Sequence, residues 1–280
     1  MKNTFVKSTI ILLLGTLATK LLGFIIKIIF TRIIKDGINL YSLIMPSYSL
    51  IIAITQLGLP YAISVIMARN NYRGIHIFAS IIPIALLFNI GMIALIFAFS
   101  PILANNLLKN PNLYYPLISI SFVIPFTTIS GIIKGYYFGK QNMLPNAVSS
   151  VFEQVTRLVL LFLIIPPLMR ISPVHAVSGY IIISAICELV QIIVYLFFAP
   201  KNIHITLNDL TPKKGIAYDV FSISIPLVSS RLIGNICYFL EPIILTNMLL
   251  FVGYSSNFIE SEYAIYNAYV IPILTMPSFF

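Results

Sequence analysis

Long stretches without a single charged residue dominate this chain of 280 residues. Residues 37–68, 74–108 and 110–133 contain no Asp, Glu, Lys or Arg and run for 32, 35 and 24 residues. A helix needs about 20 apolar residues to cross the hydrocarbon core of a bilayer. With 59% hydrophobic and 9% charged residues, the chain is far too apolar for a soluble domain or a disordered segment. The sequence therefore predicts a polytopic membrane protein.

Clusters of Pro, Asn and Gly divide the chain into eight hydrophobic segments. We expect each to be a helix, because long Leu and Ile runs lack the alternation of a membrane β-barrel. The fold class is then an all-α polytopic membrane protein, and internal prolines such as Pro60 predict bends in its helices. The segments are residues 8–34, 40–67, 77–99, 115–138, 147–169, 174–199, 220–252 and 263–280.

The cations between these segments predict the orientation of the chain, because cytoplasmic loops of membrane proteins carry an excess of Lys and Arg. With the N-terminus in the cytoplasm, nine cations fall in inside loops and four in outside loops. The net charge of +9 then reflects topology, and we expect no nucleic-acid partner. The inside cations are Lys2, Lys7, Arg69, Arg73, Lys134, Lys140, Lys201, Lys213 and Lys214, and the outside ones are Arg32, Lys35, Lys109 and Arg170.

Four further cations lie within predicted spans: Lys20, Lys27, Arg157 and Arg231. Each is a functional hypothesis, because a charge at the bilayer centre costs at least about 2.5 kcal/mol. Lys20 and Lys27 are seven residues apart, so they lie on one helix face about 10 Å apart along the axis. Such a line of ammonium groups suits an anion in a wet cavity. In the alternative, one or both side chains extend to a lipid headgroup.

Polar residues in three later segments predict ion pairing and a polar cavity. Glu153 and Arg157 have the i,i+4 spacing of an ion pair on one helix, which could be structural or form a gate. Glu188, Gln191 and Asn235 lie on stripes that should face protein rather than lipid, either lining a cavity or bonding neighbouring helices. No spacing of ligand-type residues indicates a metal, and we expect no cofactor.

A short internal repeat predicts two lobes. Residues 18–24 (Ala-Thr-Lys-Leu-Leu-Gly-Phe) are echoed by residues 229–235 (Ser-Ser-Arg-Leu-Ile-Gly-Asn), although a chance match is the alternative. If the seventh segment restarts the pattern of the first, parallel repeats are indicated. We expect a six-helix lobe over residues 1–200, a cytoplasmic loop over 201–219 and the start of a second lobe over 220–280. The last segment ends without a polar flank, which suggests a piece of a longer protein.

Three stretches resemble a known family: residues 19–24, residues 57–64, and above all residues 134–143 with the run Gly-Tyr-Tyr-Phe-Gly-Lys-Gln-Asn-Met, followed by Glu153, Gln154 and Arg157. They resemble the stage V sporulation protein B branch of the polysaccharide biosynthesis transporters. That branch belongs to the multidrug/oligosaccharidyl-lipid/polysaccharide (MOP) exporter superfamily. The resemblance implies a MATE-like bundle, here the N-terminal six-helix lobe and the first two helices of a second lobe.

The same resemblance implies a flippase of the bacterial cytoplasmic membrane. Its substrate would be an undecaprenyl-pyrophosphate-linked oligosaccharide or a peptidoglycan or polysaccharide precursor, moved to the outer leaflet by alternating access. Lys20, Lys27 and Arg231 would bind the pyrophosphate, and Glu153 with Arg157 would form a gate. The partners would be this lipid-linked saccharide and the bilayer, with a coupling ion left open.

Two alternatives to the flippase differ in the residues they require. A cation-coupled multidrug antiporter of the same superfamily predicts a cavity dominated by carboxylates. A membrane-embedded phosphosugar transferase needs clustered acids or histidines in the aqueous loops, whereas the inside loops offer only His76, His204, Asp209 and Asp219 without a metal-ligand spacing. We therefore expect a transporter and not an enzyme.

Overall fold

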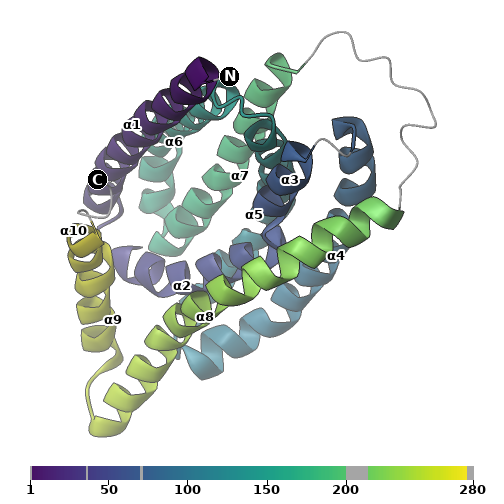
Figure 1. The fold of residues 1–280 in the computed structure, drawn as a ribbon. Coiled ribbons are helices and arrows are strands. Elements are labelled where there is room, and N and C mark those ends of the chain that lie inside the picture. Colours follow the sequence, from purple (N-terminus) through teal and green to yellow (C-terminus); the bar gives the residue numbers. More distant parts are fainter. Residues whose placement is uncertain (1, 36, 70–71, 200–213, 276–280) are drawn as a thin grey trace.

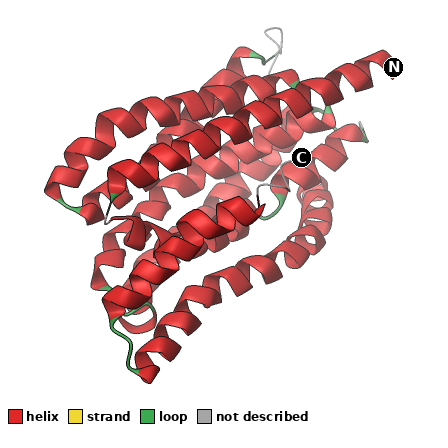
Figure 2. Ribbon diagram, turned by 90° about the vertical axis from the view of Figure 1, so that its left-hand side faces the viewer, coloured by secondary structure: helices red, strands yellow, loops and turns green. Residues whose placement is uncertain are grey.

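The computed structural model describes residues 2–35, 37–69, 72–199 and 214–275. Within these ranges the chain consists of helices and the loops that join them (Figure 2). The helices are α1 (Lys2–Ile34), α2 (Gly37–Gln56), α3 (Leu59–Ala68), α4 (Gly74–Ile102), α5 (Tyr114–Gly139), α6 (Leu144–Ile171), α7 (Pro173–Phe197), α8 (Lys214–Val252), α9 (Ser256–Ile265) and α10 (Ile271–Thr275). Short π- and 3₁₀-turns extend α4, precede α5 and join α9 to α10.

Seven spans in the described chain are long and apolar enough to cross a membrane, and the chain is a multi-pass membrane protein. They match the first seven expected segments, with α2 and α3 sharing one span. The eighth segment is helical over α9 and α10 but is not among these seven spans. Helix α9 begins before residue 263 and includes Glu260 and Glu262.

Helix α5 lies at the centre of the bundle, in contact with α3, α4 and α7. Outward from it, α7 packs on α6, and α6 packs on α1 (Figure 1). Gly135 and Gly139 bring α5 close to α3: a Cβ added to Gly139 would lie 2.3 Å from the Cβ of Met67, and one on Gly135 would lie 2.6 Å from the carbonyl oxygen of Pro60. Small residues permit such close approach of membrane helices.

The expected segment 40–67 is two helices, because the backbone turns at Leu57 and Gly58, which have φ values of 48° and 63°. Irregular backbone at membrane depth requires partners for its polar groups. Helix α8 supplies one, since the Ser224 hydroxyl donates a hydrogen bond to the Leu57 carbonyl. Gly58 leaves room for Val228, whose Cγ2 would lie 2.7 Å from an added Cβ. Helix α8 therefore packs against the break between α2 and α3; we call this contact the α8 contact site.

Helix α8 begins at Lys214, inside the range 201–219 that the sequence suggested was a loop. That boundary was wrong because Ile216 and Val220 pack into an apolar cluster with α3 and α4, which favours helix. The Tyr72 hydroxyl also donates to Asp219 Oδ2 at 2.7 Å, and this bond raises the pKa of Tyr72 above its ordinary value. Residues 201–213, the rest of the expected loop, lie outside the described residues.

Candidate functional site

Two adjoining cavities lie between α8 and the helices α2, α3, α5, α6 and α7. One has a volume of about 280 Å³ and the other about 220 Å³. They share Gln56, Pro60, Tyr61 and Arg231 in their walls, so we treat them as one central cavity. The charged side chains that line it are Lys134 of α5, Glu153 of α6, Glu188 of α7 and Arg231 of α8.

The predicted ion pair is present at the wall of this cavity. Arg157 Nη2 lies 2.6 Å from Glu153 Oε1, and the two side chains are only 18% and 15% exposed. Both partners also bond to α7: Gln191 Nε2 donates to Glu153 Oε2 at 3.3 Å, and Arg157 Nη1 donates to the Ser184 hydroxyl at 3.3 Å. The charge of Arg157 is thus paired within the contact between α6 and α7, while Glu153 faces the cavity.

Glu188 lies in the cavity wall together with Lys134 and Glu153. The hydroxyl of Ser130 on α5 donates a hydrogen bond to Glu188 Oε2. In the sequence Glu188 stands far from any cation, but the packing of α5 on α7 brings Lys134 to the same cavity. The cavity therefore contains carboxylates of two helices and cations of two others, rather than an excess of one sign.

Arg231 reaches the cavity from α8. Its guanidinium carbon lies 4.2 Å from the centroid of the Tyr61 ring, an arrangement in which a cation is attracted to the ring face. The side chain is exposed. Asn235, one turn further along α8, lines the larger part of the cavity and donates to the Arg231 carbonyl at 3.0 Å. Arg231 therefore presents its charge to the cavity, against a ring on α3.

The two lysines of α1 do not line the central cavity. Lys27 and Thr31 line a separate cleft of about 380 Å³, whose other wall is formed by Ala268, Tyr269 and Pro272. Lys20 is partly buried on the same helix, which packs against α6. The expected grouping of both lysines with Arg231 around one cavity is therefore not found in the described part of the chain.

Seven polar residues of the cavity wall were not predicted as site residues: Tyr48, Ser49, Gln56, Tyr61, Ser130, Lys134 and Ser150. Lys134 was counted among the inside cations, although the expected segment 115–138 contains it, and in the structure it lies within α5. A signal was present in the sequence, since Ser130, Lys134 and Phe138 are spaced i, i+4, i+8 and so share one helix face. Lys134 Nζ lies 5.7 Å from the Phe138 ring centroid.

Comparison with known proteins identifies the family. A family model described as "Polysaccharide biosynthesis protein" matches residues 5–280. The chain belongs to this family. The resemblance that the sequence motifs suggested is thus confirmed, and so is the all-α membrane fold that it implied.

Curated relatives agree with this assignment. The chain is 33% identical to stage V sporulation protein B of Bacillus subtilis (strain 168) over 290 residues, covering 99% of this chain and 56% of that protein. It is 26% identical to sporulation protein YkvU of the same organism, over 99% of this chain and 62% of that protein. Lipid II flippase MurJ of that organism is 26% identical over 58% of this chain and 32% of its own length. The chain thus spans a little over half the length of the first two relatives.

A solved structure shares the fold. It is described as the inward-facing conformation of a multidrug resistance MATE family transporter of the MOP superfamily. The TM-score is 0.60 at 16% sequence identity, and the match covers 88% of this chain and 58% of the other. The helical bundle is therefore MATE-like.

Proposed function

We propose that the protein is a flippase for a polyprenyl-pyrophosphate-linked saccharide, and that the described chain supplies the first lobe and the start of the second. The observation that carries this proposal is the central cavity, where Arg231 of α8 faces Lys134 and the acidic pair Glu153 and Glu188 of the first lobe. The similarity to lipid II flippase MurJ supports a lipid-linked substrate. We place the protein in the bacterial cytoplasmic membrane with its N-terminus in the cytoplasm.

Charge neutralisation is the chemical basis of the proposal. A pyrophosphate cannot leave water for a membrane interior unless fixed cations and hydrogen-bond donors replace its hydration. Arg231 and Lys134 offer two cations in one cavity, with the Tyr61 ring and Asn235 beside Arg231. Lys20 and Lys27 remain proposed pyrophosphate contacts from α1, Lys27 acting in its own cleft against the C-terminal segment.

The Glu153–Arg157 pair is the proposed gate. It joins α6 to α7 through Gln191 and Ser184, so a movement that separates these helices must break at least two of its hydrogen bonds. A coupling cation or proton that competes for Glu153 would loosen the contact from the cavity side. The lobes would then alternate between openings toward the two leaflets, as inferred for a bundle built of two repeats. The division into a lobe over residues 1–200 and a second lobe from residue 220 is part of this proposal.

The second candidate is a cation-coupled multidrug antiporter. Two observations favour it: Glu153 and Glu188 both line the cavity, and the fold is that of a MATE family transporter. Acidic side chains at membrane depth are suited to binding a cationic drug, a proton or a metal cation. The two candidates therefore differ in the sign of charge that the cavity must accept.

Translocation in proteoliposomes distinguishes the candidates. The full-length protein is reconstituted with a fluorescent undecaprenyl-pyrophosphate disaccharide, or with the same disaccharide on an uncharged polyprenol, and outer-leaflet label is removed by an impermeant reductant. We expect the pyrophosphate lipid to cross at least about 10-fold faster than the uncharged one, since hydrogen bonds to a charged group contribute about 1.5 to 3 kcal/mol. Equal rates, or transport of a cationic dye alone, would contradict the flippase.

A further inference from the structure

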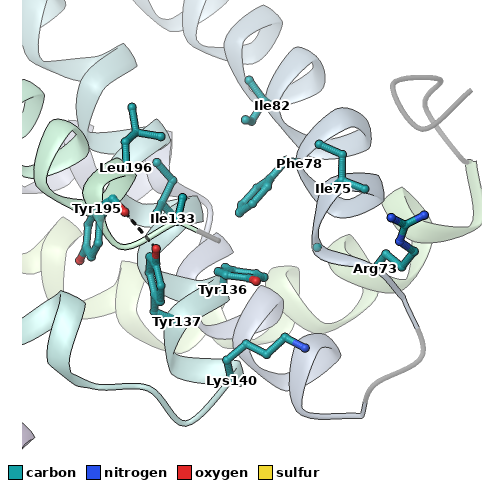
Figure 3. A pocket seen from close by; sticks show the side chains of 12 residues that line it. Arg73, Ile75, Phe78, Ile82, Ile133, Tyr136, Tyr137, Lys140, Tyr195 and Leu196 are labelled. Atoms are coloured by element: carbon teal, nitrogen blue, oxygen red, sulfur yellow. Dashed lines mark hydrogen bonds between the residues drawn. The ribbon is translucent and has the colours of Figure 1, made fainter. Parts of the chain in front are cut away.

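A second cavity opens on a different face of α5. It has a volume of about 460 Å³ and lies against α4, α5 and α7. None of its lining residues belongs to the central cavity. Figure 3 shows Phe78 and Ile82 of α4 facing Ile133 and Tyr136 of α5 across it, while Arg73 and Lys140 lie at one end. We call this cavity the α4–α7 groove.

The groove is charged at one end and apolar along its length. Arg73 directly precedes the span that begins at Gly74, and Lys140 directly follows the span that ends at Gly139. Both exposed cations therefore lie at the same edge of the membrane. Phe78 and Ile82 lie four and eight residues into α4, which is about 6 and 12 Å along the helix axis. The groove thus extends from a basic rim at the membrane edge to the level of the lipid acyl chains.

Contacts of α5 with α4 and α7 fix the positions of the side chains that line the groove. Tyr137 donates a hydrogen bond to the Tyr195 carbonyl of α7 at 2.9 Å, which appears as a dashed line in Figure 3. On the other side, Gly74 lets α4 approach the Tyr136 ring, since an added Cβ would lie 2.5 Å from it. The Phe78 and Tyr136 rings lie 5.3 Å apart. A ligand would enter a preformed site, which lowers the entropic cost of binding.

We propose that the α4–α7 groove binds an anionic glycerophospholipid of the surrounding bilayer, with its phosphate group on Arg73 and Lys140 and one acyl chain along Phe78, Ile82 and Ile133. Charge complementarity supports this occupant: basic pockets between membrane helices at the membrane edge bind anionic headgroups. Asp and Glu are absent from the described residues that line the groove, whereas two carboxylates line the central cavity. The two cavities therefore favour different ligands.

A single introduced tryptophan reports the lipid in the groove. The 280-residue chain contains no tryptophan, and the unsubstituted protein supplies any background. Ile82→Trp places the probe in the groove. Ile84→Trp is the matched control, because Ile84 is two residues further along α4, is 39% exposed and does not line the groove. The full-length protein is reconstituted in vesicles of phosphatidylcholine with phosphatidylglycerol, one of the two carrying brominated acyl chains that quench tryptophan.

The proposal predicts stronger quenching of Ile82→Trp by brominated phosphatidylglycerol than by brominated phosphatidylcholine, and equal quenching of Ile84→Trp by both. Arg73→Gln or Lys140→Gln should each lower the preference for phosphatidylglycerol about 5-fold, the effect of one basic side chain at an anionic lipid surface. Equal quenching at Ile82→Trp, or a preference that survives both substitutions together, would overturn the proposal. Loss of the preference on adding a few mole per cent of undecaprenyl phosphate would overturn it too, because the groove would then be a polyprenyl-lipid site.

Native mass spectrometry provides a test without tryptophan. The unsubstituted protein, released from detergent, should retain phosphatidylglycerol in preference to phosphatidylcholine from an equimolar mixture. The Arg73→Gln, Lys140→Gln double variant should lose this preference while its thermal unfolding is unchanged. Equal retention of the two lipids by the unsubstituted protein contradicts the proposal.

Discussion

Arg157 on α6 and Arg231 on α8 both lie at membrane depth but in opposite settings. Arg157 is 18% exposed and pairs with Glu153 at 2.6 Å, whereas Arg231 is exposed and contacts the face of the Tyr61 ring. The two spans are similar in burial, since 17% of the most apolar stretch is buried in the span of α6 and 11% in the span of α8. The difference therefore lies in the partners of the two side chains. Arg157 of α6 is paired within the helix bundle, and Arg231 of α8 presents its charge to the cavity.

The largest effect should come from breaking the Glu153–Arg157 pair. Arg157→Leu leaves the Glu153 carboxylate buried without its partner, which costs about 3 to 5 kcal/mol of folding free energy. Replacing both residues by Leu should cost less, because no uncompensated charge remains. Unfolding of the purified variants in mixed detergent micelles measures both. Equal losses for the single and the double variant would show that the pair is not a stabilising unit.

An intermediate effect is expected where α5 meets α3. Gly135→Ala places a methyl group 2.6 Å from the Pro60 carbonyl oxygen, so the helices must separate, at a cost of about 1 to 3 kcal/mol. Gly234→Ala on α8 is the matched control, because no atom lies within 4 Å of the added Cβ. The same unfolding measurement should show little change for Gly234→Ala. Comparable destabilisation of both variants would contradict the difference between the two regions.

The smallest effect should come from a substitution at the α8 contact site, where α8 packs against the break between α2 and α3. Ser224→Ala removes the hydrogen bond to the Leu57 carbonyl and should cost about 1 kcal/mol, a typical net value for one hydrogen bond. Ser222→Ala is the control, because Ser222 is exposed and donates only to the Asp219 carbonyl of its own helix. Hydrogen exchange at residues 57–59 should increase in Ser224→Ala and not in Ser222→Ala. Unchanged exchange in both would show that α8 is not held there.

The sequence predicted most of the fold, because the bilayer demands long apolar helices and such runs are visible in one dimension. It predicted a bend at Pro60, but not the full break between α2 and α3, where Leu57 takes a left-handed conformation and its carbonyl bonds to Ser224 of α8. It also placed the start of α8 too late, since the burial of Ile216 and Val220 depends on packing with α3 and α4. These errors arose where distant segments determine local structure.

Local spacing likewise limited the prediction of the site. Glu153 and Arg157 were paired correctly because their contact is within one helix turn. Lys134 was counted only as an inside cation, because its place in the cavity that Glu188 lines depends on the packing of α5 on α7. Lys27 was grouped with Arg231, yet the structure places them in separate cavities. Helix periodicity predicts which residues share one face of a helix, but not which other helix packs against that face.

Transport by Arg231→Ala is the most direct test of the central claim that α8 presents its charge to a substrate. Pyrophosphate-lipid translocation by the full-length variant should fall at least about 10-fold, with membrane insertion and unfolding unchanged, and Arg231→Lys should retain part of the rate because the charge remains. Arg170→Ala, an exposed arginine in the last turn of α6, should transport normally. Normal transport by Arg231→Ala would contradict the account.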